Sequence, residues 1–409
     1  MWGRHPWMEV PAVQQVFASL GAPDVDVRFV GGCVRNSVLG REVGEIDIAT
    51  PERPEKVLQR LAAADLKAVP TGLDHGTITA VVRGTPFEIT TLRRDTACDG
   101  RHADVEFTAD WHEDSRRRDF TMNAMSLRDD GTLFDDHGGV EDAKAGRLQF
   151  VGNPADRIKE DYLRILRLFR LFAWYGRGAL DDNVLSACRA NVQGLGKLSA
   201  ERVQQEISKL FSAPNPGPAV MAMCECDVLE VILPEANEPS VLSNLLNLEA
   251  EAPAFSFDWL RRLAVLIPES RAGGLAKRLK FSNADKARLR ALTNIKPIVG
   301  GSLNSVEFKQ AIYRNGVAVM VDRVLMAWAS GSAHGEDEVV SWRALINEAV
   351  LWVPRQLPLT GDDIIALGVR PGPEVGKYLA EVETRWIERN FEMSRDELLD
   401  ELRRIRNSK

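Results

Sequence analysis

Short apolar runs alternate with amphipathic stretches over the first 150 residues, a pattern typical of strands and helices. Amphipathic helices are predicted at 9–20 and 54–64, the second with prolines near its start. Strands are predicted at 27–30, 66–69, 77–82 and 87–92, with a turn from Arg83 to Pro86 between the last two. This part of the chain is therefore expected to combine strands with helices.

From Pro154 onward the pattern indicates helices throughout. An apolar face recurs at helical spacing in Ile158, Tyr162, Ile165, Phe169 and Phe172. Beside it runs a polar stripe of Asp161, Arg164, Arg167 and Arg170. The stripe has two interpretations: intrahelical pairs such as Glu160 with Arg164 or Asp161 with Arg164, or a fixed acceptor and donor that read a base edge. Further helices are expected at 198–211, with Ser199 as N-cap, and from about Ser305.

Composition places the chain among ordinary globular proteins. Its 409 residues are enough for two to four modules, and 44% of them are hydrophobic. The sequence has no apolar run long enough to cross a bilayer, and its start lacks the apolar core of a secretory signal. The five cysteines have no metal-ligand spacing, so we expect reduced thiols in the cytoplasm.

The net charge of −7 is not typical of a nucleic-acid binder, but a local basic stripe can govern phosphate contact. Residues 271–290 contain one acid, Asp285, among many cations. This stretch is either a solvated helix face or a surface for nucleic-acid phosphates. Its basic residues are Arg271, Lys277, Arg278, Lys280, Lys286, Arg288 and Arg290.

The strongest chemical signal lies between Phe29 and Thr50. An apolar strand runs into Gly31 and Gly32, and a short helical piece carries Arg35. A second strand is predicted around Ile46, with Glu45 and Asp47 on one face and Ile46 in the core. Such a glycine turn or acid pair is often plain surface when it occurs alone. Together they suit a hard divalent cation and a polyphosphate, and so phosphoryl or nucleotidyl transfer.

Other candidates follow along the chain. Glu88 faces opposite to its apolar neighbours, so it is either a third carboxylate or an exposed strand residue. Residues 93–112 have weak periodicity and are predicted to form a long, mobile loop. Three arginines at 116–118 then precede an apolar segment that is expected to be a buried strand. Asp119 and Asn123 follow them at positions able to hydrogen-bond a ribose or a base.

Several motifs stand in one order: GGCVRN, GEIDIAT, FEITTLR, RRDFTMNAM, EDYLRILRLFR and LSAERVQQEISKL. This set resembles the bacterial class II tRNA nucleotidyltransferases, the family of CCA-adding enzymes and bacterial poly(A) polymerases. The likeness is close over 26–212 and looser in the basic stretch and the GPEVG tail. It implies an α+β fold with a polymerase-beta-type head and a small mixed sheet. The implied parts are a head at 1–150, then an all-helical neck at 151–212, body at 213–300 and tail at 301–409.

The activity that the resemblance implies is template-independent addition of C, C and A to the tRNA 3′ end, from CTP and ATP with Mg²⁺. The implied metal ligands are Glu45 and Asp47, with Glu88 as third acid. The implied nucleotide-binding residues are Gly31, Gly32, Arg35, Arg118, Asp119, Asn123, Asp161, Arg164, Arg167 and Arg170. Asp161 and Arg164 would recognise the base. Body and tail would grip the tRNA, and the residues expected to contact it are Lys277, Arg278, Lys280, Arg288 and Arg290.

Two positions depart from the family pattern. Glu45 stands where Asp is usual, which could move a bound metal by about an ångström. Because Glu keeps the charge and the ligand type, activity is expected to survive. Asn36 stands where Asp is common, and we expect its role to be structural.

Three alternatives remain open: a CC-adding enzyme, a poly(A) polymerase, or an RNA-binding protein with a degenerate head. The predicted loop with Asp99, Gly100 and Arg101 favours full CCA addition, since a switch from C to A needs a movable lever. The sequence indicates no membrane and no protein partner.

Overall fold

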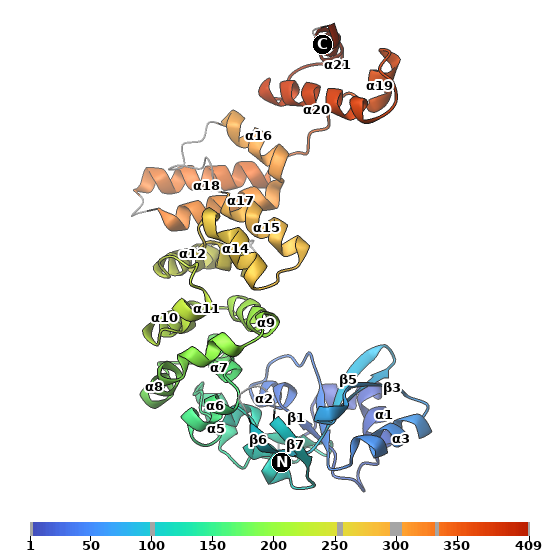
Figure 1. Cartoon of the computed structure of the whole chain (residues 1–409), viewed down its shortest axis with the longest axis vertical. Helices are drawn as coiled ribbons and strands as arrows, with labels where there is room; N and C mark the ends of the chain where they lie inside the picture. Colours follow the sequence, from blue (N-terminus) through green and yellow to red (C-terminus); the bar gives the residue numbers. More distant parts are fainter. Residues whose placement is uncertain (1–2, 99–102, 252–256, 295–304, 332–334, 408–409) are drawn as a thin grey trace. The chain divides into compact units, whose positions relative to one another are not determined.

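A computed structural model describes residues 3–98, 103–251, 257–294, 305–331 and 335–407. The chain divides into two compact units, which are treated separately below (Figure 1). Unit 1 comprises Met1–Ala236 with Arg278–Lys280, and unit 2 comprises Asn237–Lys277 with Phe281–Lys409. The four-part division into head, neck, body and tail stays a prediction.

Unit 1 contains a seven-stranded mixed sheet with the order β3-β4-β5-β2-β1-β8-β9. Strand β2 runs parallel to β5, and the other neighbouring strands are antiparallel. The predicted mixed sheet is therefore confirmed. Its strands are β1 (Arg28–Val30), β2 (Asp47–Thr50), β3 (Lys67–Gly72), β4 (Thr77–Val82), β5 (Thr85–Thr91), β8 (Ser126–Arg128) and β9 (Leu133–Phe134).

The core of the sheet forms where apolar strand residues face two amphipathic helices. Helices α1 (Pro11–Leu20) and α3 (Pro54–Ala63) pack against β4, and α3 also packs against β3 (Figure 1). Phe29, Ile48 and Ile78 are fully buried there. Burying each such side chain contributes roughly 1.5–3 kcal/mol. This packing makes β1 and β2 a rigid base for the segments that leave their ends.

Two details of the head differ from expectation. Strand β2 begins at Asp47, so Glu45 precedes it, and Ile46 is only half-buried. The core position is Ile48, because the strand has an apolar face only from that residue on. The turn between β4 and β5 consists of two residues, Arg83 and Gly84. Their φ angles are 51° and 82°, and a two-residue β-hairpin turn of type I′ requires positive φ at both positions.

The prediction of a long loop at 93–112 is wrong. Strands β6 (Arg93–Cys98) and β7 (Ala103–Phe107) pair as a separate two-stranded ribbon, and helix α4 (Trp111–Arg116) follows. A ribbon outside the main sheet needs no apolar face, so its sequence carries little alternation. The predicted lever residues Asp99 and Gly100 lie outside the described residues, and Arg101 lies outside them too.

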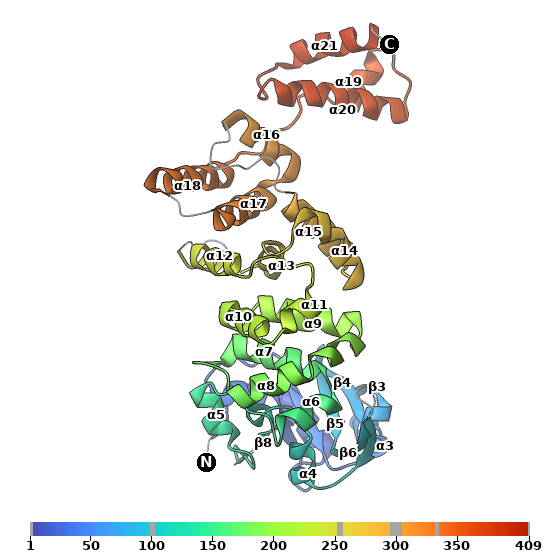
Figure 2. The ribbon, with the colours of Figure 1, turned by 60° about the vertical axis from the view of Figure 1, so that its left-hand side comes forward.

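The rest of unit 1 is helical, as expected (Figure 2, green). Ile165 and Phe169 are fully buried where α7 packs against α9 and α10. The elements are η3 (Thr121–Asn123), α5 (Gly139–Ala145), α6 (Pro154–Glu160), α7 (Leu163–Tyr175), α8 (Asp182–Ala190), η4 (Val192–Lys197), α9 (Ala200–Phe211), α10 (Gly217–Glu225) and α11 (Val228–Ile232). Ser199 caps α9 by accepting from the Arg202 amide, so the predicted N-cap is confirmed.

The continuous helix implied by the apolar face from Ile158 to Phe172 is broken. Helix α6 ends at Glu160, and Asp161 has an extended backbone with φ −151°. Its Oδ1 accepts from the Leu163 amide at 3.0 Å and so caps the start of α7. The apolar spacing survives this break because the chain resumes a helix after two residues.

Unit 2 is helical throughout its described part. Trp328 and Trp342 stack in a core around α17, with ring centroids 6.5 Å apart, and Trp386 belongs to a second core formed by α19–α21. None of the helices that the structure describes is long and apolar enough to cross a lipid bilayer. The helices are α12 (Ser240–Glu251), α13 (Trp259–Ala264), α14 (Glu269–Arg278), α15 (Asn283–Thr293), α16 (Ser305–Asn315), α17 (Val317–Ser330), α18 (Glu336–Val350), α19 (Gly361–Ala366), α20 (Pro373–Glu388) and α21 (Arg395–Asn407).

Unit 2 also buries a cluster of charges. Glu249 on α12 is 2% exposed and accepts from Arg261 and Arg262, both on α13. Arg261 donates in addition to Asp322 on α17 at 2.7 Å. The carboxylates thus tie three helices together.

Candidate active site

A glycine turn opens the site at the end of β1. Gly31 has φ 72° and ψ −128°, a conformation that favours glycine, and helix α2 (Gly32–Val38) starts directly after it. A Cβ at Gly31 would lie 3.5 Å from Asp47 Oδ2 and 3.9 Å from Arg118 Nη1. The turn therefore lets a carboxylate and a guanidinium approach the backbone closely.

Arg35 stands one turn further along α2 and is largely buried. Its Nη1 donates to Asn123 Oδ1 and its Nη2 to the Tyr175 hydroxyl, each at 2.7 Å. Asn36 beside it accepts from Arg35 and donates to the Glu42 carbonyl at 2.9 Å. Asn36 thus has a place in the local hydrogen-bond network.

The acids lie at the start of β2. Asp47 is aligned with Glu88 in the parallel β2–β5 ladder, and both side chains therefore leave the same face of the sheet. Burial, and then the charge of Glu88, raise the pKa of Asp47 to about 6, with Arg118 opposing the shift and Glu45 adding to it. A cation bound beside these acids would favour their charged form.

Metal ligation by protein groups alone finds less support. Among the described residues, no group of three or more histidines, cysteines, aspartates and glutamates is arranged to hold a metal ion. Glu45 and Asp47 line one pocket, whereas Glu88 does not. Glu88 is exposed on its strand, and it acts on Asp47 through its charge.

The pocket itself has a volume of about 520 Å³. Nine of its lining side chains are Arg or Lys and four are Asp or Glu, so it attracts anions. The predicted residues brought together in it are Gly31, Gly32, Arg35, Glu45, Asp47, Arg118, Asp119, Asn123, Asp161, Arg164, Arg167 and Arg170.

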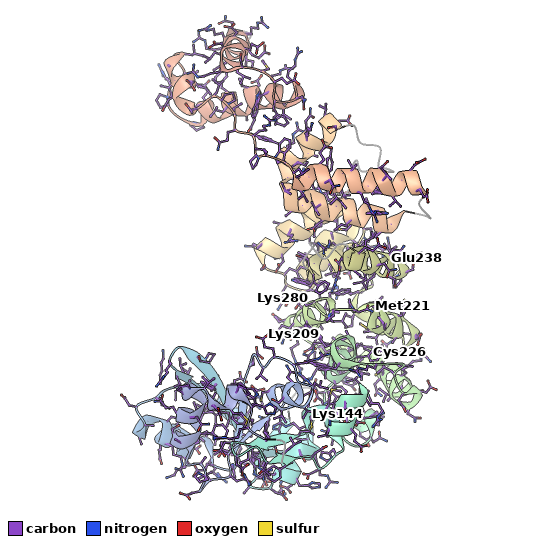
Figure 3. All side chains as sticks on the ribbon, turned by 180° about the vertical axis from the view of Figure 1, so that it is seen from behind. Lys144, Lys209, Met221, Cys226, Glu238 and Lys280 are labelled. Atoms are coloured by element: carbon purple, nitrogen blue, oxygen red, sulfur yellow. The ribbon has the colours of Figure 1, made fainter. Side chains whose placement is uncertain are left out.

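Five lining residues were missed by sequence reasoning. Arg202 and Lys209 stand on one face of α9, about two turns apart, and that spacing could have indicated them. Lys209 is exposed and is labelled in Figure 3. The others are Arg93, Arg117 and Leu163.

Asp119 and Arg167 join the head to α7 inside the pocket. Arg167 Nε donates to Asp119 Oδ2 at 2.6 Å, and Asp119 Oδ1 accepts from Asn123 Nδ2 at 3.1 Å. Burial opposes ionisation of Asp119, but Arg167 and Asn123 outweigh it and lower the pKa of this carboxyl to about 2. Asp119 is therefore charged at neutral pH and fixed in orientation.

Asp161 and Arg164 line the pocket, but each has other partners. Asp161 Oδ2 accepts from Arg202 Nη2 on α9 at 2.7 Å. Arg164 Nη1 donates to Glu160 Oε2 at 2.5 Å, and its Nη2 donates to the Arg117 carbonyl at 3.1 Å. The predicted Glu160–Arg164 pair is thus confirmed. The Asp161–Arg164 pair is wrong, because the break at Asp161 turns its carboxylate toward α9.

The residues of the basic stretch lie outside this pocket. Within unit 1, Arg278 pairs with Glu235 and Lys280 with Glu201, each at 2.6 Å. Within unit 2, Arg288 pairs with Asp322 at 2.9 Å. Lys277 and Arg290 are exposed. These ion pairs favour the solvated-surface interpretation for three of the five cations, and contact with RNA stays a prediction.

Known proteins resemble this chain in sequence and in fold. A family model described as Poly A polymerase head domain matches residues 27–149, and one described as probable RNA and SrmB-binding site of polymerase A matches residues 179–238. The human mitochondrial CCA tRNA nucleotidyltransferase 1 is 33% identical over 93% of this chain and 87% of its own length. The CCA-adding enzyme of Limosilactobacillus fermentum is 28% identical over 93% of both chains.

Two solved structures extend the likeness to the fold. The Bacillus stearothermophilus CCA-adding enzyme in complex with CTP superimposes with a TM-score of 0.73 at 26% identity, covering 97% of this chain and 98% of the other. The Thermotoga maritima CCA-adding enzyme, at 20% identity and a TM-score of 0.64, shares the fold over 95% of this chain and 93% of its own.

Proposed function

The chain belongs to the CCA tRNA nucleotidyltransferase family, and from that premise we propose that it adds C, C and A to the 3′ end of tRNA. CTP and ATP are the substrates, and no nucleic-acid template directs the choice. One observation carries this proposal. A single cationic pocket is lined both by the acid pair Glu45 and Asp47 and by the candidate base-reading pair Asp161 and Arg164. One relative is named a CCA-adding enzyme and another was solved as a CCA-adding enzyme in complex with CTP, which adds support.

The triphosphate is the part of the substrate that the cationic wall suits best. Arg35, Arg118 and Arg170 line the pocket from three different elements, so they can surround a polyanion. Arginine binds phosphate oxygens through two parallel N–H groups, which fixes orientation as well as position. The protein's main contribution to the reaction is then positioning and electrostatic stabilisation.

Glu45 and Asp47 are the residues that would hold Mg²⁺. Their carboxylate oxygens are the donors that this ion prefers, and burial together with the charge of Glu88 raises the pKa of Asp47, which a bound cation would lower again. The other two acids of the pocket, Asp119 and Asp161, are hydrogen-bonded to Arg167 and Arg202, so water and substrate oxygens would be needed beside Glu45 and Asp47. Bound there, the ion would neutralise charge on the phosphates and lower the pKa of the attacking 3′-hydroxyl. Glu88 would act as the third acid through its charge beside Asp47.

Asp161 and Arg164 are suited to choosing the base. Cytosine and adenine both present an amino donor beside an unprotonated ring nitrogen on their pairing edge, whereas uracil and guanine present a carbonyl beside an N–H. A carboxylate acceptor beside a guanidinium donor complements the first pattern and repels the second. Arg202 and Glu160 hold the two readers in place, so discrimination does not depend on a template.

Asp119 is suited to the ribose, together with Arg118. The carboxylate is buried and charged, and Arg167 and Asn123 fix its direction. A hydroxyl donor that reaches it would complete its hydrogen bonding. Charged acceptors of this kind make hydrogen bonds about twice as strong as neutral ones.

The remaining helices are proposed to hold the tRNA through phosphates and shape. Lys277 and Arg290 are exposed and are the cations best placed to contribute. Binding through phosphates weakens as salt increases. We also propose a cytoplasmic location, supported by the free thiols of Cys33, Cys188, Cys224 and Cys226. The human relative is mitochondrial by name, so an imported location is the alternative.

An extension assay tests the proposal. A tRNA lacking its last three nucleotides is incubated with CTP, ATP and Mg²⁺, and the product is sized. Growth by three nucleotides supports CCA addition. Growth by two supports a CC-adding enzyme, long A tails on unrelated RNA support a poly(A) polymerase, and tRNA binding without growth supports the degenerate head.

A further inference from the structure

Asp114 lies outside the pocket but binds two arginines of its wall. The residue stands on α4 and is 3% exposed. Arg117 Nε donates to Asp114 Oδ1 at 2.8 Å, and Arg118 Nη2 donates to Oδ2 at 3.1 Å. Each oxygen of one carboxylate therefore holds a different cation of the pocket.

The same carboxylate also anchors the β6–β7 ribbon. The Arg93 amide, at the first residue of β6, donates to Asp114 Oδ1 at 3.2 Å. The next residue, Arg94, donates to Glu113 on α4 at 3.1 Å. The base of the ribbon is thus tied to α4 at two consecutive positions, and the pocket arginines depend on the same helix.

Arg118 stands between two acids. Its Nη2 donates to Asp114, while its Nη1 lies beside the Gly31 turn that also approaches Asp47 Oδ2. Arg118 attracts Asp47 through its charge, and among the described side chains the two form no hydrogen bond with each other. If Asp114 lost its charge, Arg118 would lose this partner, and Asp47 is a carboxylate beside the same glycine turn that already attracts it. The arginine side chain is long and flexible, so a new pair with Asp47 would then be favoured.

We propose that Asp114 is a positioning residue for nucleotidyl transfer: it holds Arg117 and Arg118 at the pocket wall and keeps Arg118 from pairing with Asp47. The proposal rests on the proposed function. A residue with a merely structural role would stabilise the head without affecting how Asp47 is used. The two possibilities differ in their effects on the requirement for Mg²⁺ and on the coupling to Arg118.

The test compares Asp114→Asn with a matched control, Asp26→Asn. Asp26 also accepts from two arginines, Arg28 and Arg128, but it lies outside the pocket. For Asp114→Asn we expect kcat/KM with CTP and with ATP to fall about 10- to 100-fold, as for a misplaced active-site group. The Mg²⁺ concentration for half-maximal rate should rise several-fold, because Arg118 then competes for Asp47. CTP binding without tRNA, measured by calorimetry, should weaken about tenfold, whereas the control should match wild type in all three.

A combined variant makes the claim specific. If Asp114 acts through the two arginines, then adding Asp114→Asn to Arg117→Ala with Arg118→Ala makes the enzyme no slower than the two arginine changes alone. The proposal would be overturned if Asp114→Asn caused a further loss of rate in that background. It would also be overturned if Asp114→Asn alone left the Mg²⁺ requirement unchanged. Should Asp114→Asn fail to fold, Asp114→Glu keeps the charge and displaces the carboxylate. That variant should fold and show a smaller loss of the same kind, and wild-type kinetics from it would also overturn the proposal. Wild-type enzyme that adds no nucleotide would instead contradict the proposed function.

Discussion

Asp161 accepts a hydrogen bond from Arg202 at 2.7 Å, although 41 positions separate the two residues in the chain. Asp161 stands in the break between α6 and α7, and Arg202 stands in the first turn of α9. Because Asp161 also caps α7 with its other oxygen, both of its carboxylate oxygens have fixed partners. The orientation of this acceptor is therefore set by the protein before any nucleotide arrives.

Arg202 should therefore control the choice of nucleotide. In Arg202→Ala we expect incorporation of UTP and GTP relative to CTP to rise about tenfold, since a carboxylate held at one oxygen only discriminates less, by roughly 1–2 kcal/mol. Single-nucleotide incorporation kinetics on tRNA measure this. Gln205→Ala, an exposed position on the same helix, is the control. Equal selectivity in Arg202→Ala and wild type would refute this role.

Glu45 should tolerate shortening but not loss of charge. Glu45→Asp is expected to stay within about tenfold of wild type, because the ligand type is kept and only its reach changes. Glu45→Gln and Asp47→Asn should lose more than about 100-fold, since each removes an anionic ligand. Primer-extension rates at saturating Mg²⁺ give the comparison, and Glu42→Gln, exposed in the same segment, is the control. An inactive Glu45→Asp variant would count against the assignment of Glu45.

Asp119 should make unit 1 sensitive to acid. Its folded pKa of about 2 lies below the ordinary aspartate value of 3.8, so its stabilising effect is complete above pH 4 and is lost as pH falls toward 2. The lost contribution is about 2 kcal/mol. Urea unfolding at several pH values should show this loss in wild type, and a shallower decline over the same interval in Asp119→Asn. Parallel pH profiles would contradict the prediction.

Glu249 should be essential to the stability of unit 2. Glu249→Gln removes the acid that Arg261 and Arg262 share in a buried position, and breaking such a pair costs about 3–5 kcal/mol. Glu251→Gln on the same helix alters an exposed pair with Arg343 and should cost less than about 1 kcal/mol. The midpoint of urea unfolding measures both. Similar midpoints for the two variants would show that burial of Glu249 matters little.

Much of the head and of the site could be predicted from local pattern. The alternation of apolar and polar residues predicts the bounds of β4. The recurrence of apolar residues at helical spacing predicts the ends of α3 and α9 to within one or two residues. The glycine turn and the acids of Glu45 and Asp47 were found together because they are close in sequence.

What local pattern could not predict depends on contacts over long distances. The pairing of β6 with β7 carries no apolar signal, since neither strand joins the main sheet. Arg202 could not be paired with Asp161 from the sequence, because only the packing of α7 against α9 brings the two residues together. The break at Asp161 was hidden by an apolar spacing that continues across it.

The most direct measurement is the sequence of the 3′ ends made on a tRNA that stops before its terminal CCA, with all four nucleoside triphosphates present at equal concentration. If side chains in one pocket choose the base, the added ends should read CCA for tRNAs of different sequence, with U and G rare. Frequent U or G, or added sequences that follow the tRNA supplied, would contradict a choice made by the protein.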